Sequence, residues 1–199
     1  MARMVRATGV ILAGGASRRM GSDKALVTVA GRPMFHWVRD RMSEVCETVV
    51  VAGRPEGLAG VDGLADPSGE RLGPLAGLAA ALERAEPGHV LVTATDQPWV
   101  RPATLRALLE RAGELAVVPV AHDGARQTTC AVYPTTMLPV ALDELYSGGS
   151  IQSTLDRTAF VPVSPDEWQT WGEDGRSWFS ADTPDEIAAG LSRFGPPAT

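Results

Sequence analysis

A glycine-rich segment, LAGGASRRMGSDKAL, follows the first apolar stretch of the chain and carries the residue types that bind phosphate. Its glycines, Gly14, Gly15 and Gly21, let the backbone fold tightly and expose successive N–H groups to phosphate oxygens. Arg18 and Lys24 add fixed positive charge in the same place, the first as a planar fork and the second as a point charge. For the glycines alone, a tight turn is an equal alternative, but the segment as a whole predicts a phosphate-binding loop.

The spacing of these glycines differs from that of the two commonest phosphate-binding motifs. The pattern GxGxxG is absent after this apolar stretch, and GxxxxGK[ST] is absent because Gly21 is followed by Ser22-Asp23-Lys24. The sequence therefore disfavours both a Rossmann dehydrogenase and a P-loop NTPase.

A carboxylate, Asp96, is the second candidate for chemistry. It comes directly after the apolar stretch HVLVTAT. A hard oxygen ligand at the end of a strand can hold Mg²⁺, which keeps several waters and bridges to substrate phosphates. The alternative is that Asp96 caps the following helix. Because Pro102 begins that helix and Arg101 lies nearer to it, the sequence favours the metal role.

Strands and helices alternate along the first part of the chain and must position these residues. The alternation predicts an α/β protein with a doubly wound, mostly parallel sheet flanked by helices. Ligands of such sheets bind at the carboxyl ends of the strands. We expect strands at Thr8–Ala13, Thr48–Ala52, His89–Thr93 and Leu115–Val120, and helices at Met34–Val45, Pro74–Ala85 and Pro102–Ala112.

The second half of the chain has a looser pattern. Val118–Tyr133 predicts two strands joined as an antiparallel hairpin around Asp123-Gly124. Thr183, followed by Pro184 at N1 and Glu186 at N3, predicts the N-cap of a last helix that runs through Leu191. We expect one domain over residues 1–193, helices at Thr136–Leu145 and Ser150–Leu155, a polar tryptophan-bearing insertion over 165–175, a short strand at Trp178–Ser180, and a frayed tail over 194–199.

A further carboxylate, Asp182, stands just before this last helix. The carboxyl end of the predicted strand Trp178–Ser180 would bring it to the same sheet edge as Asp96. Two carboxylates at one edge repel each other unless a cation lies between them. We therefore expect Asp182 and Asp96 to face one Mg²⁺ site, directly or through a water. The alternative is that Asp182 stabilises the helix N-terminus, where negative charge is favoured.

Composition excludes several classes of protein. The 199 residues are 44% apolar, enough for a core, and 18 Lys and Arg against 24 Asp and Glu give a net charge of −6. An acidic chain is a poor nucleic-acid binder. No apolar stretch approaches the roughly 18–20 residues of a membrane span. With no recognisable signal peptide, we expect a cytoplasmic protein. Cys46 and Cys130 are expected to be reduced, buried, small apolar side chains.

Several segments resemble one family in order and spacing. The glycine-rich segment resembles LAGGxSxRMGxDK, a signature of nucleotidyltransferases that share the fold of sugar-phosphate nucleotidylyltransferases. Within that superfamily the chain is most similar to the molybdenum cofactor guanylyltransferases, the MobA-type family. Their GPLAG, [CT]DxP[FYW], DGxRQPLxAxY and FxNxNTPE elements are matched by Gly73–Gly77, Thr95–Trp99, Asp123–Tyr133 and Phe179–Glu186.

The resemblance implies a nucleotide-diphospho-sugar transferase-like fold and an enzyme that transfers GMP from Mg²⁺·GTP to the terminal phosphate of molybdopterin, releasing pyrophosphate. It implies catalytic roles for Arg18, Lys24 and Asp96, and Mg²⁺ as the cofactor, with Asp96 and Asp182 as candidate ligands. Asp66 lies where the family has a guanine-contacting Asp, and a turn role for it is an equal alternative. The implied nucleotide-binding residues are Leu12, Ala13, Gly14, Gly15, Arg18, Lys24, Asp66 and Asp96.

Three departures from the family pattern leave the base and the acceptor open. Ala52 stands near a family Asn, Thr128-Thr129 replace Pro-Leu, and Ser180-Ala181-Asp182 replace Asn-x-Asn. An enzyme that uses CTP, or another phosphorylated acceptor such as a sugar phosphate, is the closest alternative. We expect the acceptor near Arg126. A non-catalytic nucleotide-binding module that docks onto molybdoenzymes or cofactor-biosynthesis proteins is the alternative of another class, and transient docking to such partners is also expected of an enzyme.

Overall fold

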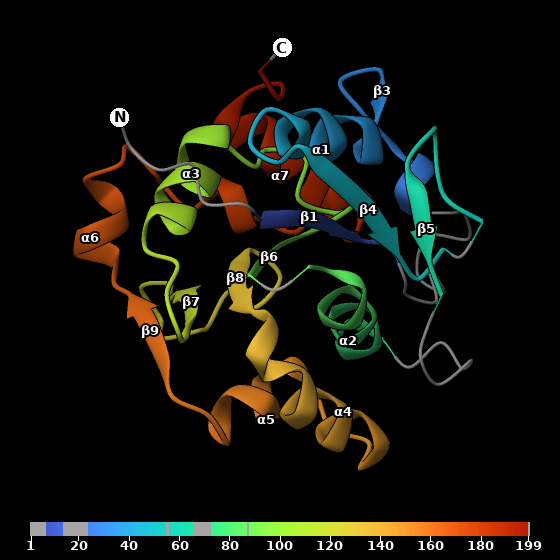
Figure 1. Cartoon of the computed structure of the whole chain (residues 1–199). Helices are drawn as coiled ribbons and strands as arrows, with labels where there is room; N and C mark the ends of the chain where they lie inside the picture. The colour runs from blue at the N-terminus through green and yellow to red at the C-terminus, as the bar shows by residue number, and fades with distance from the viewer. Residues whose placement is uncertain (1–6, 14–23, 55, 66–72, 87, 199) are drawn as a thin grey trace.

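The central sheet fixes the architecture. The computed structural model of the chain describes residues 7–13, 24–54, 56–65, 73–86 and 88–198. Within these ranges seven strands form one sheet in the order β5-β4-β1-β6-β8-β7-β9 (Figure 1). β8 is antiparallel to both neighbours, and the other neighbouring pairs are parallel, which confirms the predicted mostly parallel sheet. The strands are β1 (Ala7–Leu12), β4 (Thr48–Ala52), β5 (Asp62–Leu64), β6 (His89–Ala94), β7 (Ala116–Pro119), β8 (Ala131–Pro134) and β9 (Phe160–Val163).

Helices cover both faces of this sheet, as predicted. Figure 1 shows α1, α3 and α7 on one side and α2, α4 and α5 on the other. A small antiparallel hairpin of β2 (Thr28–Val29) and β3 (Arg32–Pro33) precedes α1. The helices are α1 (Met34–Ser43), α2 (Pro74–Arg84), α3 (Pro102–Glu110), α4 (Leu138–Tyr146), α5 (Ile151–Asp156), α6 (Pro165–Gln169) and α7 (Pro184–Phe194).

Side chains of β1 contribute to two cores because successive residues of a strand point to opposite faces. Val10 and Leu12 pack in the cluster that contains α2, whereas Ile11 packs with Phe35 and Val38 of α1. All of these side chains are buried. A strand that is apolar on both faces is typical of a parallel sheet covered on both sides, so the apolar run predicted this strand correctly.

The predicted elements of the first half lie within two residues of the observed ones. β4 spans Thr48–Ala52 as predicted, α1 ends at Ser43 rather than Val45, and β6 extends to Ala94. In the second half the hairpin around Asp123-Gly124 is confirmed. β7 and β8 pair antiparallel, and the N–H groups of Gly124 and Ala121 donate to the carbonyls of Ala121 and Ala125 across the turn.

The predicted strand Trp178–Ser180 is wrong. A 3-10 turn, Arg176–Trp178, stands at its start. The carboxylate of Glu173 accepts hydrogen bonds from the N–H groups of Gly175 and Ser177, at 2.8 and 3.3 Å. These bonds hold the start of the turn, and the N–H of Phe179, inside the predicted strand, donates to the carbonyl of Arg176 at 3.3 Å instead of to a neighbouring strand. Sequence reasoning also missed β9, a short edge strand in which Pro162 interrupts the donor pattern.

The tryptophan-bearing segment, residues 165–178, is part of the core rather than a polar insertion. Trp168 of α6 and Trp178 are buried with their ring centroids 5.3 Å apart in an edge-to-face arrangement. The indole of Trp168 donates to the carbonyl of Val120 at 3.0 Å. Glu173, also buried, accepts from the hydroxyls of Thr104 in α3 and of Ser177. The segment thus closes one end of the α3 side of the sheet.

The tail predicted to fray from Phe194 is docked at its start. Phe194 is the last residue of α7, and its ring lies 6.0 Å from the ring of Trp99. The Trp99 indole donates to the carbonyl of Gly195 at 2.8 Å, and Pro197 is buried. Trp99 also lies against α7 at Gly190, where an added Cβ would come within 2.3 Å of the ring. The N-cap predicted at Thr183 is confirmed, because its side chain accepts from the N–H of Glu186.

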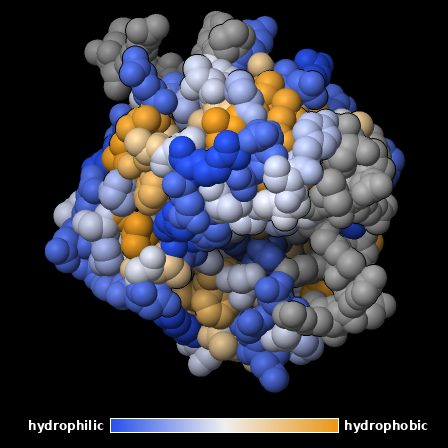
Figure 2. All heavy atoms as spheres, turned by 90° about the horizontal axis from the view of Figure 1, so that it is seen from below, coloured by the Kyte–Doolittle hydropathy of each residue, from blue (hydrophilic) through white to orange (hydrophobic). Residues whose placement is uncertain are grey.

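Surface hydrophobic residues are scattered. In the view from below, Figure 2 shows separate hydrophobic patches among hydrophilic residues. In the part of the chain that the structure describes, the large exposed apolar side chains are Leu26, Leu115, Tyr146 and Val161, which come from different parts of the chain. Single exposed residues of this kind are ordinary on a globular surface. Among the described residues, no helix is long and apolar enough to cross a membrane.

Candidate functional site at the carboxyl ends of β1 and β6

The candidate site lies where the strand order changes direction. From β1 the chain proceeds to β4 and β5 on one side and then returns to β6 on the other side of β1. In an open α/β sheet this switch point leaves a crevice outside the carboxyl ends of the two strands. The glycine-rich segment begins at the end of β1 with Leu12 and Ala13, and Asp96 follows β6, so the topology brings the start of that segment and Asp96 to one edge.

Backbone hydrogen bonds hold the strand ends together. The N–H of Thr95 donates to the carbonyl of Leu12 at 3.1 Å, and the N–H of Ala13 donates to the carbonyl of Ala52 at 2.9 Å. Leu12, Ala13 and Asp96, three of the predicted site residues, are therefore placed side by side. Ala52, which stands near a family Asn, also lies at this edge and presents only a methyl group.

Helix α2 supports this edge through a close approach. An added Cβ on Gly77 would lie 2.8 Å from Leu12 Cδ2 and 3.0 Å from Ala52 Cβ. The first glycine of the same motif, Gly73, has φ of +81° at the N-cap, and Pro74 follows at the first turn. A positive φ favours glycine, and proline suits the first turn of a helix. The GPLAG segment thus packs α2 directly on the ends of β1 and β4.

Asp96 is not the cap of the following helix. The N-cap of α3 is Arg101, which makes no side-chain capping bond. Instead, the Asp96 carbonyl accepts from the N–H of Ala181 at 2.8 Å. This bond places the residue before Asp182 against the Asp96 turn. The predicted strand was wrong, but the predicted proximity of the C-terminal segment to Asp96 is confirmed for the backbone.

Gln97 is a site residue that sequence reasoning missed. Its side chain is 2% exposed. The amide oxygen accepts from the N–H of Ala94 at 3.0 Å, and the amide nitrogen donates to the hydroxyl of Thr129 at 3.0 Å. The side chain therefore links the turn that carries Asp96 to the hairpin that carries Arg126. The available signal was a polar residue of amide type directly after the candidate metal ligand.

Arg126, expected near the acceptor, is held at the other end of this hairpin. Its guanidinium donates to the Asp156 carboxylate at 2.7 Å and lies over the ring of Phe160, 5.7 Å from its centroid. Gln152 donates to its carbonyl at 3.2 Å. The pair with Asp156 is partly exposed, and such pairs contribute little to stability. An anionic group of a substrate could therefore replace Asp156 at small cost.

The hairpin that enters β8 is anchored by buried, uncharged groups. Burial raises the pKa of Tyr133, so its hydroxyl stays protonated and donates to the carbonyl of Thr128 at 2.7 Å.

Burial, with a smaller effect of the Glu173 charge, raises the pKa of Cys130. Burial also raises the pKa of Cys46 to about 12. Both cysteines are free and buried, as the sequence predicted.

Several predicted site residues lie outside the described residues. Gly14, Gly15, Arg18 and Asp66 fall in the ranges 14–23 and 66–72. Lys24 is described for its backbone, which begins the 3-10 turn Lys24–Leu26. Within the described ranges, no group of three or more His, Cys, Asp or Glu side chains is arranged to hold a metal ion. The magnesium roles of Asp96 and Asp182 stay predictions.

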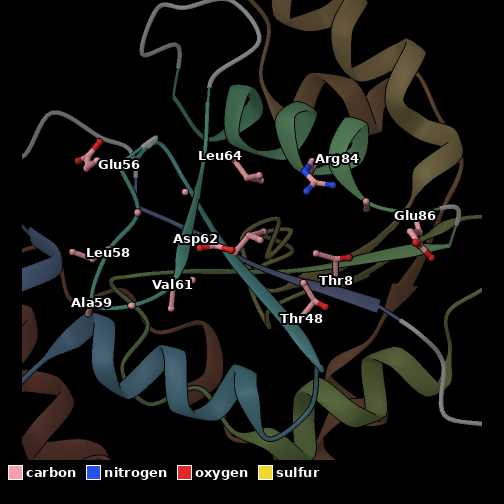
Figure 3. A pocket seen from close by; sticks show the side chains of 15 residues that line it. Thr8, Thr48, Glu56, Leu58, Ala59, Val61, Asp62, Leu64, Arg84 and Glu86 are labelled. Atoms are coloured by element: carbon pink, nitrogen blue, oxygen red, sulfur yellow. The ribbon is translucent and has the colours of Figure 1, made fainter.

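A separate hollow of about 860 Å³ lies toward the amino ends of β1 and β4. Figure 3 shows Thr8 and Thr48, which are paired on these two strands, with Asp62 of β5 and Arg84 of α2 also lining it. It is therefore at the opposite end of β1 from Asp96. Because ligands of open α/β sheets bind at the carboxyl ends of the strands, this hollow is not the candidate active site.

Fold and site together define a class of protein: a nucleotidyltransferase with the nucleotide-diphospho-sugar transferase fold. Molybdopterin-guanine dinucleotide biosynthesis protein A from Archaeoglobus fulgidus has a similar structure, with a TM-score of 0.80 and 26% identity, over 93% of this chain and 97% of that one. A probable molybdenum cofactor guanylyltransferase of Bacillus licheniformis is 36% identical over 170 residues, covering 79% of this chain and 84% of the relative. One of Natronomonas pharaonis is 31% identical over 199 residues, covering 94% and 98%.

The chain belongs to the MobA-like NTP transferase family, whose model matches residues 9–161. That range runs from β1 to β9 and includes the glycine-rich segment and the Asp96 turn. The last helix and Asp182 lie beyond it. The resemblance inferred from the motifs is confirmed.

Proposed function

We propose that the chain transfers GMP from GTP to the terminal phosphate of molybdopterin, bound as molybdenum cofactor, and releases pyrophosphate. An oxygen of the acceptor phosphate attacks the α-phosphorus of GTP, and the bond between the α-phosphorus and the bridging oxygen to the β-phosphate breaks. The acceptor oxygen is already anionic, so no strong general base is needed. Catalysis then rests on alignment and on neutralising charge at the α-phosphate.

The observation that carries this proposal is the junction of the two strand ends. The hydrogen bond from Thr95 to Leu12 joins the turn that bears Asp96 to the start of the glycine-rich segment. Nucleotide phosphates held by that segment would lie beside the carboxylate. In the proposal Arg18 and Lys24 hold the phosphates, Leu12, Ala13, Gly14 and Gly15 contribute backbone, and Asp66 contacts the guanine.

Mg²⁺ fits the donor set of this edge. Carboxylate oxygens are the ligands it prefers, and Asp96 is only partly buried, so a bound cation could keep its waters. Asp96 would hold it, and Asp182 would be a second contact from the C-terminal segment. When bound, the ion would supply positive charge that polarises the α-phosphate and orients it.

Names of the relatives support the substrates, since those that align over most of this chain are called molybdenum cofactor guanylyltransferases. The base is less constrained by the site, because Ala52 offers no polar contact near the place of a family Asn. Docking of the enzyme to molybdoenzymes or to other cofactor-biosynthesis proteins stays a prediction, as does a cytoplasmic location.

The test measures pyrophosphate release with molybdopterin as molybdenum cofactor and each of GTP, CTP, ATP and UTP in the presence of Mg²⁺. We expect release with GTP only, and a rise in melting temperature with GTP because a ligand that binds the native state stabilises it. Release with CTP alone would replace the proposal by a cytidylyltransferase. Nucleotide binding without release with this acceptor or with sugar phosphates would favour the non-catalytic module.

A further inference from the structure

The side chain of Gln97 continues the sheet beyond its last backbone pair. The ladder between β6 and β8 ends at the pair Val92 and Ala131. The N–H of Thr95 points to β1, where it binds the carbonyl of Leu12, so the N–H of Ala94 points to the β8 side. There the Gln97 amide oxygen accepts it. One side chain thus takes the place of a missing strand next to Asp96.

The other end of this side chain is bound to a fixed segment. Thr129 accepts from the Gln97 amide nitrogen at 3.0 Å. Its neighbours are held on both sides, because the N–H of Gln127 donates to the carbonyl of Pro119 at 2.8 Å and that of Cys130 to Gln127 at 3.0 Å. The Tyr133 hydroxyl holds Thr128. The hydroxyl of Thr129 is therefore a rigid acceptor, which a family Leu at this place would not supply.

We propose that Gln97 and Thr129 form a polar bridge that positions the Asp96 turn and couples it to the hairpin that carries Arg126. The inference rests on the proposed function for the role of Asp96. Among the contacts between described residues, three hold the turn to other segments: Thr95 to β1, Ala181 to the carbonyl of Asp96, and Gln97 to the hairpin. Two of them use backbone groups. The bridge is the one of these three that a side-chain substitution can cut.

Burial gives the bridge its strength. Gln97 is almost fully buried, so a lost partner leaves a polar amide without compensation from water. A shift of the Asp96 turn would then relieve the unpaired Gln97 amide. The bridge residues touch neither phosphate nor metal in this proposal, and they are positioning residues rather than catalytic ones.

The first experiment uses Thr129→Val, which keeps the shape and removes the hydroxyl, with Thr129→Ser as the rescue and Thr128→Val as the matched control. Turnover and the binding of GTP are each measured across a Mg²⁺ titration, with melting temperature recorded for every variant. For Thr129→Val we expect the Mg²⁺ needed for half-maximal turnover and for half-maximal GTP binding to rise on the order of fivefold. Thr129→Ser and Thr128→Val should stay within about twofold of the parent chain.

The second experiment is a double-mutant cycle with Gln97→Met, which keeps the length of the side chain and removes both hydrogen bonds. If the two residues act through one bridge, the double variant is no worse than Gln97→Met alone. Multiplicative effects in the double variant would overturn the coupling. An unchanged Mg²⁺ requirement in Thr129→Val would overturn the positioning role, even with a lowered melting temperature.

The two proposals fail separately. If Asp96→Asn leaves the Mg²⁺ requirement and turnover unchanged, the proposed function of Asp96 is wrong, whatever Thr129→Val does. If Asp96→Asn abolishes turnover while Thr129→Val matches the parent chain in both titrations, the metal site stands and the bridge is wrong.

Discussion

The half of the sheet formed by β5, β4, β1 and β6 and the half formed by β8, β7 and β9 are held together differently. In the first half, parallel strands lie between α1 on one face and α2 on the other, and backbone hydrogen bonds align the carboxyl ends of β1, β4 and β6. The second half is held by polar side chains that bind residues distant in sequence: Glu173 binds Thr104, and Thr129 binds Gln97, which follows β6 of the first half. We therefore expect the catalytic residues in the first half, whereas the second half orients and closes the site that they form.

This contrast predicts different consequences for substitutions in the two halves. Asp96, at the strand ends of the first half, is only partly buried and belongs to none of the hydrophobic clusters, so its loss should change turnover and leave the melting temperature alone. A buried polar side chain in the second half binds backbone and hydroxyl groups, so its loss should lower stability. The predictions below begin with the largest of these effects.

Asp96→Asn should reduce turnover on the order of a thousandfold with an unchanged melting temperature, because the amide has the same size but is a poorer Mg²⁺ ligand. Steady-state kinetics at saturating GTP and thermal unfolding measure the two quantities. Asp62→Asn is the control: it changes a carboxylate on the edge strand β5, two strands away from β1, in the hollow of Figure 3, and should leave both unchanged. Near-normal turnover of Asp96→Asn would contradict the assignment.

Glu173→Ala should lower the free energy of unfolding by about 3 kcal/mol, because it leaves two hydroxyls and several backbone N–H groups without an acceptor in the core. Urea unfolding measures this loss. The control is Glu167→Ala in the same segment. Its ion pair with Arg111 is partly exposed and should contribute less than about 1 kcal/mol. Equal effects of the two substitutions would show that Glu173 does not organise the segment.

Gly190→Ala should destabilise by about 1–2 kcal/mol, because the new methyl group would overlap the ring of Trp99. The greater helix propensity of alanine offsets part of this cost. In a Trp99→Phe background the smaller ring leaves room, and Gly190→Ala should then be neutral or stabilising. If the substitution costs the same in both backgrounds, the contact between α7 and Trp99 does not limit packing.

The sequence predicted the features whose signals are local. The apolar run of β1, the turn at Asp123-Gly124 and the cap at Thr183 each lie within a few neighbouring residues, and the structure confirms them. The position of the site at the carboxyl ends of β1 and β6 followed from topology. Parallel strands bring Leu12 and Asp96 together independently of the conformation of the loops.

The features that it did not predict depend on contacts between distant residues. Gln97 and Thr129 are 32 residues apart, Thr104 and Glu173 are 69 apart, and Trp99 and Gly195 are 96 apart. No local pattern of hydrophobicity or turn residues encodes these pairs. For the same reason the segment before α7 resembled a strand, and the end of the chain resembled a frayed tail.

Asp182 tests whether the C-terminal segment belongs to the site or only to the helix that follows it. The structure weakens the helix alternative, since the Thr183 side chain already caps α7 and Asp185 and Glu186 already place negative charge in its first turn. The N–H of Ala181, one residue before Asp182, binds the carbonyl of Asp96. We therefore expect Asp182→Ala to raise the Mg²⁺ needed for half-maximal turnover about threefold, an effect near that of one ordinary hydrogen bond, with little change in melting temperature.

The matched control for this last substitution is Asp185→Ala, which removes a charge from the first turn of the same helix. It should cost a few tenths of a kcal/mol in the free energy of unfolding, lessened by added salt, and leave the Mg²⁺ requirement unchanged. If Asp182→Ala instead behaves like Asp185→Ala, with a stability loss of up to about 1 kcal/mol and an unchanged Mg²⁺ titration, Asp182 is a helix-end charge. Asp96 would then hold the cation without a second carboxylate from the C-terminal segment.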